Sequence, residues 1–175
     1  MSIKLSNIYH TYSKGTPFER LALNDVSLEI SKGEIVAIIG HTGSGKSTLV
    51  QHLNGLLKPD KGSASIDDIN ITAKSAEAKT ARQQVGMVFQ NPDNQIIGTS
   101  VEEDVAFGPE NKNIEPEKIR KIVETVLRKV KLWDRRKASP SRLSGGQKQR
   151  LATADALAGL PACLVLDEPT AMLDP

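Results

Sequence analysis

The sequence predicts an α/β fold built around a phosphate-binding loop, and three observations lead to that prediction. Residues 40–48 match the pattern Gly-x4-Gly-Lys-[Ser/Thr]. An apolar, β-branched run at 34–39 precedes this loop, and leucines at helical spacing follow it. Two further apolar runs, 85–90 and 164–166, lead into polar side chains. Apolar strands separated by helical segments favour a sheet that is covered by helices.

The composition is typical of a single soluble domain. The chain has 175 residues, of which 38% are hydrophobic and 25% charged, so it is long enough to bury a core. A net charge of +2 gives no reason to expect a general nucleic-acid surface. The single cysteine excludes a disulfide within the chain, which fits a reducing cytoplasm. No apolar stretch approaches the roughly 20 residues of a membrane helix and no signal peptide is recognisable, so we expect any membrane function to act through a partner.

The N-terminal segment predicts a small antiparallel sheet. Residues 3–8 and 26–30 each carry alternating apolar residues, and the second run ends in a turn at 31–33. Tyr12 lies in the turn-rich connection between them, in a chain with only 3% aromatic residues. Tyr12 either stacks on a purine or packs against its own sheet, and spacing alone does not separate these roles.

The phosphate-binding loop predicts a nucleoside triphosphate ligand. We expect 34–39 to form a buried strand, and the loop after it to place backbone N–H groups around phosphate oxygens at the positive end of a helix. Lys46 is expected to reach the β and γ phosphates, and Ser47 to ligate Mg²⁺. The predicted nucleotide-binding residues of the loop are Gly40, His41, Thr42, Gly43, Ser44, Gly45, Lys46, Ser47 and Thr48.

The middle of the chain predicts two more strands. Residues 63–71 indicate a strand with a loop at its acidic centre, and 72–84 a short helix or loop. The strand at 85–90 ends on Gln90, and the proline-containing segment 91–95 breaks it. Gln90 either reaches a ligand from the exit of the strand or bonds to the backbone of the local turn.

Residues 116–130 form the clearest amphipathic helix of the sequence. Apolar residues recur at helical spacing, Pro116 suits the first turn, and charged residues fill the other face. We expect a helical subdomain at about 95–158, inserted into the α/β core and with Trp133 packed inside it.

A second glycine motif follows this helix. The five residues Leu143, Ser144, Gly145, Gly146 and Gln147 precede an Ala- and Leu-rich helix that extends to about residue 158. Ser144 is a suitable cap for the helix, so this loop predicts a second anion site.

Paired acids follow the last apolar strand, at 164–166. Asp167 is expected to hold Mg²⁺ through water, and Glu168 to act as the general base for an attacking water. Two acids at a strand end are commonly only solvated, but their position downstream of a phosphate loop favours the catalytic role.

Taken together, 40–47, Gln90, 143–147 and 164–168 resemble the nucleotide-binding domain of ATP-binding cassette (ABC) proteins, and the resemblance covers the whole chain. It implies a P-loop NTPase with a RecA-like parallel-sheet core, a small antiparallel layer and an inserted helical subdomain. Within the family, several segments resemble the ATPase subunits of energy-coupling factor (ECF) transporters, which import cobalt, nickel and vitamins. These segments are 53–56, 89–95, 103–111 and 172–175.

The resemblance implies further residue roles. Tyr12 corresponds to the adenine-stacking aromatic, Gln90 to the residue that senses Mg²⁺ and water, and Asp174 to the D-loop aspartate. Ser144 and Gly146 are implied to contact the γ-phosphate of ATP that the opposite subunit holds. Two chains then close over two ATP molecules. The implied Mg²⁺ ligands are Ser47, Gln90 and Asp167.

The implied function is an ATPase that drives uptake of a vitamin or a transition-metal ion from the cytoplasmic face of the membrane. The expected partners are a second ABC ATPase subunit, identical or paralogous, a transmembrane coupling subunit and a substrate-binding membrane subunit, without nucleic acid. Segment 91–95 and the acidic residues 102–104 are expected to dock the coupling subunit. The alternative is a soluble ABC ATPase of DNA maintenance or translation, although Ser144 lies only 54 positions (144 minus 90) after Gln90, without sustained heptads between them.

The sequence also departs from the family pattern. Family members continue past this point and carry a switch histidine beyond the D-loop, whereas the histidines here are His10, His41 and His52. The resemblance therefore implies that the C-terminal part of the core is missing. Thr153 and Asp155 stand where small or aliphatic residues are more usual.

Overall fold

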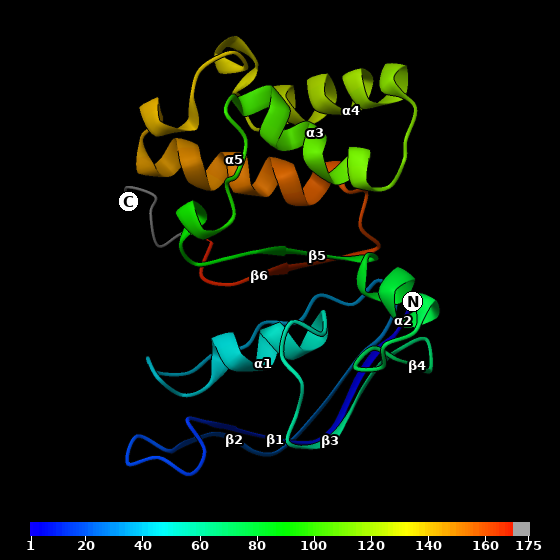
Figure 1. The fold of residues 1–175 in the computed structure, drawn as a ribbon, viewed down its shortest axis with the longest axis vertical. Helices are drawn as coiled ribbons and strands as arrows, with labels where there is room; N and C mark the ends of the chain where they lie inside the picture. Colours follow the sequence, from blue (N-terminus) through cyan, green and yellow to red (C-terminus); the bar gives the residue numbers. More distant parts are fainter. Residues whose placement is uncertain (170–175) are drawn as a thin grey trace. The chain divides into compact units, whose positions relative to one another are not determined.

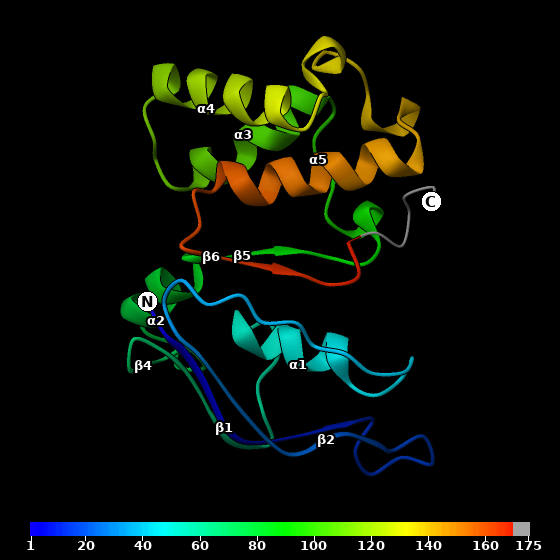
Figure 2. The same cartoon turned by 180° about the vertical axis from the view of Figure 1, so that it is seen from behind.

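The computed structural model describes residues 1–169 and divides into two compact units (Figures 1 and 2). The first unit spans residues 1–85, and the second begins at Gly86. The first contains β1 (Ile3–Tyr12), β2 (Arg20–Ile30), α1 (Lys46–Leu53), β3 (Lys61–Ile66), β4 (Ile69–Asn70) and α2 (Ala76–Arg82). The elements that follow are β5 (Val85–Val88), η1 (Pro92–Asn94), α3 (Val101–Asn111), α4 (Pro116–Lys129), η2 (Trp133–Arg135), η3 (Pro140–Arg142), α5 (Gly145–Ala158) and β6 (Cys163–Leu166).

The first unit contains the predicted antiparallel sheet, with strand order β2-β1-β3-β4. The register pairs Ile3 with Ile30, Leu5 with Leu28 and Ile8 with Val26, which confirms the prediction from the alternating runs. Apolar side chains of β1 and β3 are buried on one face of the sheet. Their burial stabilises the pairing of the strands. The predicted acidic turn is also confirmed, since Asp67 and Asp68 adopt left-handed backbone angles between β3 and β4.

The predicted buried strand at 34–39 is wrong for the part of the chain that the structure describes. These residues form no strand, and Ile35 and Ile39 are 98% and 93% exposed. A strand forms by hydrogen bonding to a neighbour and by covering its apolar face. Within residues 1–169, neither sheet pairs with this run. A β-branched sequence alone therefore does not produce the strand.

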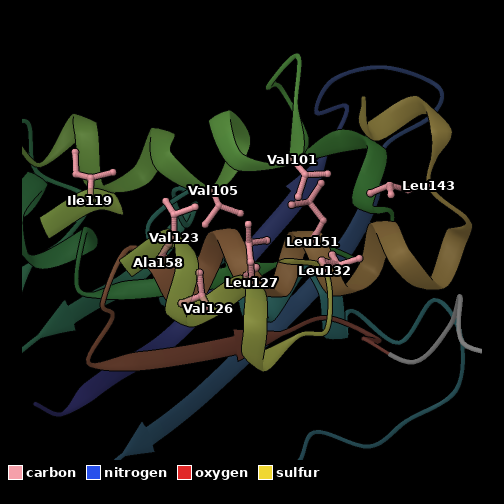
Figure 3. Packing of buried hydrophobic residues seen from close by; sticks show 11 residues of the cluster. Val101, Val105, Ile119, Val123, Val126, Leu127, Leu132, Leu143, Leu151 and Ala158 are labelled. Atoms are coloured by element: carbon pink, nitrogen blue, oxygen red, sulfur yellow. The ribbon is translucent and has the colours of Figure 1, made fainter. Parts of the chain in front are cut away.

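The core of the second unit lies among three helices (Figure 3). The α4 helix confirms the amphipathic prediction, because its apolar face is buried against α3 and α5. Trp133 packs against the same cluster, and the Arg136 guanidinium lies 4.5 Å from its ring centroid. The fully or largely buried residues of the cluster are Val101, Val105, Ile119, Val123, Val126, Leu127, Leu132, Leu143, Leu151, Ala154 and Ala158.

Two aspartates, the buried Asp104 and the partly buried Asp155, lie close together where α3 meets α5. Asp104 is 3% exposed, and its Oδ1 accepts hydrogen bonds from the backbone N–H groups of Ile97 (2.8 Å) and Gly98 (2.6 Å). Burial, and then the neighbouring Asp104 carboxylate, raise the pKa of Asp155 to about 9. Asp155 is therefore protonated at neutral pH.

No helix within residues 1–169 is both long enough and apolar enough to cross a bilayer.

Candidate nucleotide-binding and hydrolysis site

The phosphate-binding loop turns sharply before α1 and rests on β2. Gly43 and Gly45 adopt left-handed backbone angles, with φ of 81° and 93°. A Cβ atom on Gly45 would lie 2.6 Å from the carbonyl oxygen of Ala22, so only glycine fits there. The Arg20 guanidinium donates to the Gly43 carbonyl at 3.1 Å. The loop conformation thus depends on its glycines and on the antiparallel sheet.

Lys46 is the first residue of α1, and its ammonium lies against the loop. The Nζ atom donates to the carbonyl oxygens of Gly40 (2.9 Å) and His41 (3.2 Å). The cap residue Gly45 supplies no side-chain acceptor to the first turn of α1, which also carries the hydroxyls of Ser47 and Thr48. The loop therefore places a cation at the N-terminal end of a helix, which is an arrangement suited to phosphate.

Tyr12 ends β1 beside the same helix. Its hydroxyl lies 3.2 Å from Oγ1 of Thr48, and the residue is 41% exposed. The structure therefore places the predicted base-stacking ring next to α1. Its stacking on adenine stays a prediction.

The second unit brings together two predicted catalytic side chains that are distant in sequence. Nε2 of Gln90 donates to Oε2 of Glu168 at 2.8 Å, across a separation of 78 residues. The contact arises because β5 and β6 are neighbours, and the Asp167 N–H donates to the Val88 carbonyl at 2.9 Å just beyond them. Side chains that follow the two strands therefore meet at one edge of the sheet.

The two acids differ in their surroundings. Asp167 is only 6% exposed, whereas Glu168 is exposed and has a left-handed backbone angle, with φ of 48°. A residue in this conformation interrupts the extended chain, so β6 does not continue through Glu168.

The second glycine motif caps its own helix, as predicted. The Ser144 Oγ accepts from the Gln147 N–H at 3.4 Å, and Oε1 of Gln147 accepts from the Ser144 N–H at 2.9 Å. Leu143 is buried in the helical core, and Gly145 and Gly146 open α5. The capping role of Ser144 is confirmed, whereas its contact with a nucleotide of another subunit stays a prediction.

Sequence reasoning missed a link between the segment after β5 and α5. Gln95 donates through Nε2 to the Ala152 carbonyl at 2.8 Å and accepts from the Phe89 N–H at 3.4 Å. Lys148 forms an ion pair with Asp93 at 2.7 Å. No local pattern distinguishes these residues from ordinary polar loop residues, because Ala152 lies 57 positions from Gln95 and Lys148 lies 55 positions from Asp93.

The structure corrects part of the predicted docking surface. Asp104 points inward to the N–H groups of Ile97 and Gly98, so it offers no charge to a partner. A groove of about 1100 Å³ instead runs between α3 and α4. Its walls carry Glu102, Glu103, Glu110, Glu115 and Glu124, and its apolar surface comes mainly from Ala106, Ile114, Ile119, Val123 and Trp133.

The predicted Mg²⁺ ligands fit a hard cation chemically. Ser47 offers a hydroxyl, Asp167 a carboxylate and Gln90 an amide oxygen, since the amide nitrogen of Gln90 donates to Glu168. Mg²⁺ takes such oxygen ligands together with phosphate and water. Ser47 belongs to the first unit and the other two to the second. Within the described residues no three His, Cys, Asp or Glu side chains form a metal cluster, and Asp174 lies outside them.

Comparison with known proteins identifies the family. The model of the ABC transporter family matches residues 23–171. The chain belongs to this family. Its α/β architecture accordingly matches solved ABC ATPase domains.

The similar ABC proteins include curated transporter subunits. The chain is 52% identical to the energy-coupling factor transporter ATP-binding protein EcfA2 of Clostridium tetani, over all of this chain and 62% of that protein. It is 51% identical to EcfA1 of Caldanaerobacter subterraneus subsp. tengcongensis, over 99% of this chain and 62% of that protein. The chain thus spans about 62% of the length of these curated relatives.

Two solved ABC structures are also similar. One is cbiO1 from Clostridium perfringens, part of the ABC transporter complex cbiONQ, with a TM-score of 0.81 and 40% identity over 99% of this chain and 67% of that chain. The other is a dimeric ATP-binding cassette in a post-hydrolysis state bound to ADP and Pi. Its TM-score is 0.87 and its identity 36%, over 98% of this chain and 76% of that chain.

Proposed function

We propose that this ABC chain is the ATP-binding and hydrolysing subunit of an ECF-type importer. The observation that carries the proposal is the 2.8 Å contact between Gln90 and Glu168, directly after β5 and β6. The similarity to EcfA1 and EcfA2 supports the importer class. Uptake of a vitamin or a transition-metal ion, at the cytoplasmic face of a membrane, is part of the proposal.

Some residues of the chain bind the nucleotide and others transfer the proton. Lys46 neutralises charge on the β and γ phosphates, and Tyr12 stacks on the base. Gln90 holds one carboxylate oxygen of Glu168, which orients that group to accept a proton from the attacking water. Ser47, Gln90 and Asp167 are the residues that would hold Mg²⁺, which would neutralise charge on the phosphates.

The proposed assembly contains a second ABC subunit, identical or paralogous. Ser144 and Gly146 contact the γ-phosphate of ATP in the partner, and the dimeric, ADP-bound relative supports this arrangement. Closure over two nucleotides and reopening after hydrolysis then move a transmembrane coupling subunit, which acts with a substrate-binding membrane subunit. The non-transport alternative is not favoured, because α3 and α4 occupy the segment between Gln90 and Ser144.

The groove between α3 and α4 is the proposed docking site for the coupling subunit. Its glutamates suit a cytoplasmic helix with basic residues, and its apolar floor suits the apolar face of that helix. Reversing charge at Glu103 and Glu110 together should reduce co-purification with the membrane subunit. The matched control is Glu77→Lys with Glu117→Lys, which makes the same charge change outside the groove. Equal co-purification of the two double variants would remove the groove from the interface.

The experiment that tests hydrolysis is Glu168→Gln in the assembled transporter. The amide keeps the shape but accepts no proton, so kcat should fall by a factor of about 10² to 10⁴ while ATP still binds. Glu117→Gln, an exposed change on α4, is the control and should retain activity. Wild-type turnover by Glu168→Gln would assign the general base to another residue.

A further inference from the structure

Two buried histidines connect the predicted base-stacking tyrosine to the helix that follows the phosphate-binding loop. His52, in α1, is fully buried, and its Nδ1 lies 2.8 Å from the Thr48 carbonyl oxygen. His10, in β1, is 8% exposed, with its ring centroid 5.0 Å from that of His52. The His10 ring also meets the Tyr12 ring edge-on, at 4.7 Å and 73°. A continuous series of edge-on ring contacts therefore extends from His52 in α1 through His10 to Tyr12.

Thr48 contacts both ends of this series of aromatic rings. Its carbonyl accepts from His52, and its hydroxyl meets the Tyr12 hydroxyl at 3.2 Å. Desolvation by burial lowers the pKa of His52, so the imidazole is neutral at pH 7 and its Nδ1–H is the donor to Thr48. His10 is held in turn by the Lys58 carbonyl, 3.3 Å from its Nδ1. Each ring is thus fixed by its neighbour and by a backbone carbonyl.

We propose that His10 and His52 are positioning residues for the nucleotide base, which hold the Tyr12 ring in register with the phosphate-binding helix. The ligand class is a purine nucleoside triphosphate. The inference rests on the proposed function, because it requires that the loop binds the triphosphate and that Tyr12 meets the base.

The physical reason is preorganisation. Tyr12 stands at the end of a strand and is 41% exposed, so a single hydroxyl contact would leave its ring free to rotate away. Edge-on packing against His10 removes that freedom before the nucleotide arrives, and binding then loses less conformational entropy. Since Thr48 belongs to α1, the same contacts set the distance between the base and the phosphates. If the histidines served only to pack the core, their loss would affect the binding of the base and the binding of the phosphates equally.

The test compares ATP with inorganic tripolyphosphate, which has the phosphates but no base. Both are titrated with Mg²⁺ by calorimetry into the wild-type protein and into His10→Leu and His52→Leu. ATP affinity should fall about two- to tenfold, the range expected for loss of an aromatic pair contact, while tripolyphosphate affinity stays unchanged. His10→Phe restores the edge-on ring contact and should bind ATP nearly as the wild type does.

The control is Tyr9→Leu, on the same strand. The Lys61 ammonium lies 5.7 Å from the centroid of the Tyr9 ring, which is not one of the three rings in contact. The variant should therefore keep the wild-type affinities for ATP and for tripolyphosphate. If His52→Leu does not fold, the comparison of His10→Leu with His10→Phe decides alone. Equal loss of both affinities, or no loss of either, overturns the positioning role. If the wild-type protein does not bind tripolyphosphate, or if Lys46→Ala still binds it, the phosphate-loop assignment is overturned and this inference with it.

Discussion

The helices α1 and α5 both begin at a glycine motif, but their first turns are satisfied in opposite ways. Ser144 and Gln147 form a reciprocal capping box at the start of α5. The start of α1 has Gly45 as its cap, which supplies no side-chain acceptor. The first turn of a helix has N–H groups that need acceptors from outside the helix. The first turn of α5 thus has a side-chain cap within its own motif, whereas that of α1 has none, and we expect phosphate oxygens of a bound nucleotide to accept from the N–H groups of α1.

Each of the two helices also carries a titratable group with a shifted pKa, His52 in α1 and Asp155 in α5, and the two shifts have opposite consequences for stability. Burial lowers the pKa of His52 in α1, so the unfolded chain binds the proton more readily and stability falls as the pH drops below about 6.5. The pKa of Asp155 in α5 is raised to about 9, so the folded chain binds the proton more readily. The contribution of Asp155 is therefore lost as the pH rises from about 4 through about 9.

The largest expected effect that separates the two helices is the pH dependence from Asp155. Between pH about 4 and about 9, the free energy of unfolding of the protein should fall with rising pH by up to about 1.4 kcal/mol per pH unit, the value for one proton. Asp155→Asn keeps a neutral group of the same shape and should remove most of that slope. Urea unfolding followed by the fluorescence of Trp133, the only tryptophan and a residue of the second unit, measures it. Equal slopes in the two proteins would show that Asp155 does not retain its proton.

A smaller effect is expected at the cap of α5. Ser144→Ala removes the acceptor of the Gln147 N–H and should cost about 1 kcal/mol of unfolding free energy. Ser141→Ala is the matched control, because the Ser141 hydroxyl contacts only Ser139 in the described hydrogen bonds and is exposed. The same denaturation assay measures both variants. A loss of similar size in both would mean that the capping box adds nothing specific.

Short-range patterns predicted most helices, turns and strands, because their residues interact with near neighbours. The alternating runs of β1 and β2 and the cap at Ser144 are examples. The prediction of a strand at 34–39 is wrong because a strand also needs a neighbouring strand to pair with, and the local sequence pattern does not show whether one is present. Asp104 was misassigned to the surface for the same reason, since its partners are backbone N–H groups of a neighbouring turn.

The candidate site was predictable as a set of residues but not as a set of contacts. The motifs identified Gln90 and Glu168 separately, and only the adjacency of β5 and β6 brings them within hydrogen-bonding distance. The His10 and His52 rings carried no sequence signal, because two histidines 42 positions apart (52 minus 10) have no shared pattern.

The measurement that tests the account most directly is a titration with a fluorescent ATP analogue and Mg²⁺. Lys46→Ala removes the ammonium at the start of α1 and should weaken binding by at least tenfold, from the loss of a charge-assisted contact worth about 1.5–3 kcal/mol. Lys32→Ala removes the same charge from the exposed turn before the loop and should leave the affinity unchanged. Unchanged affinity in Lys46→Ala, or an equal loss in both variants, would contradict the assignment of the α1 start as the triphosphate site.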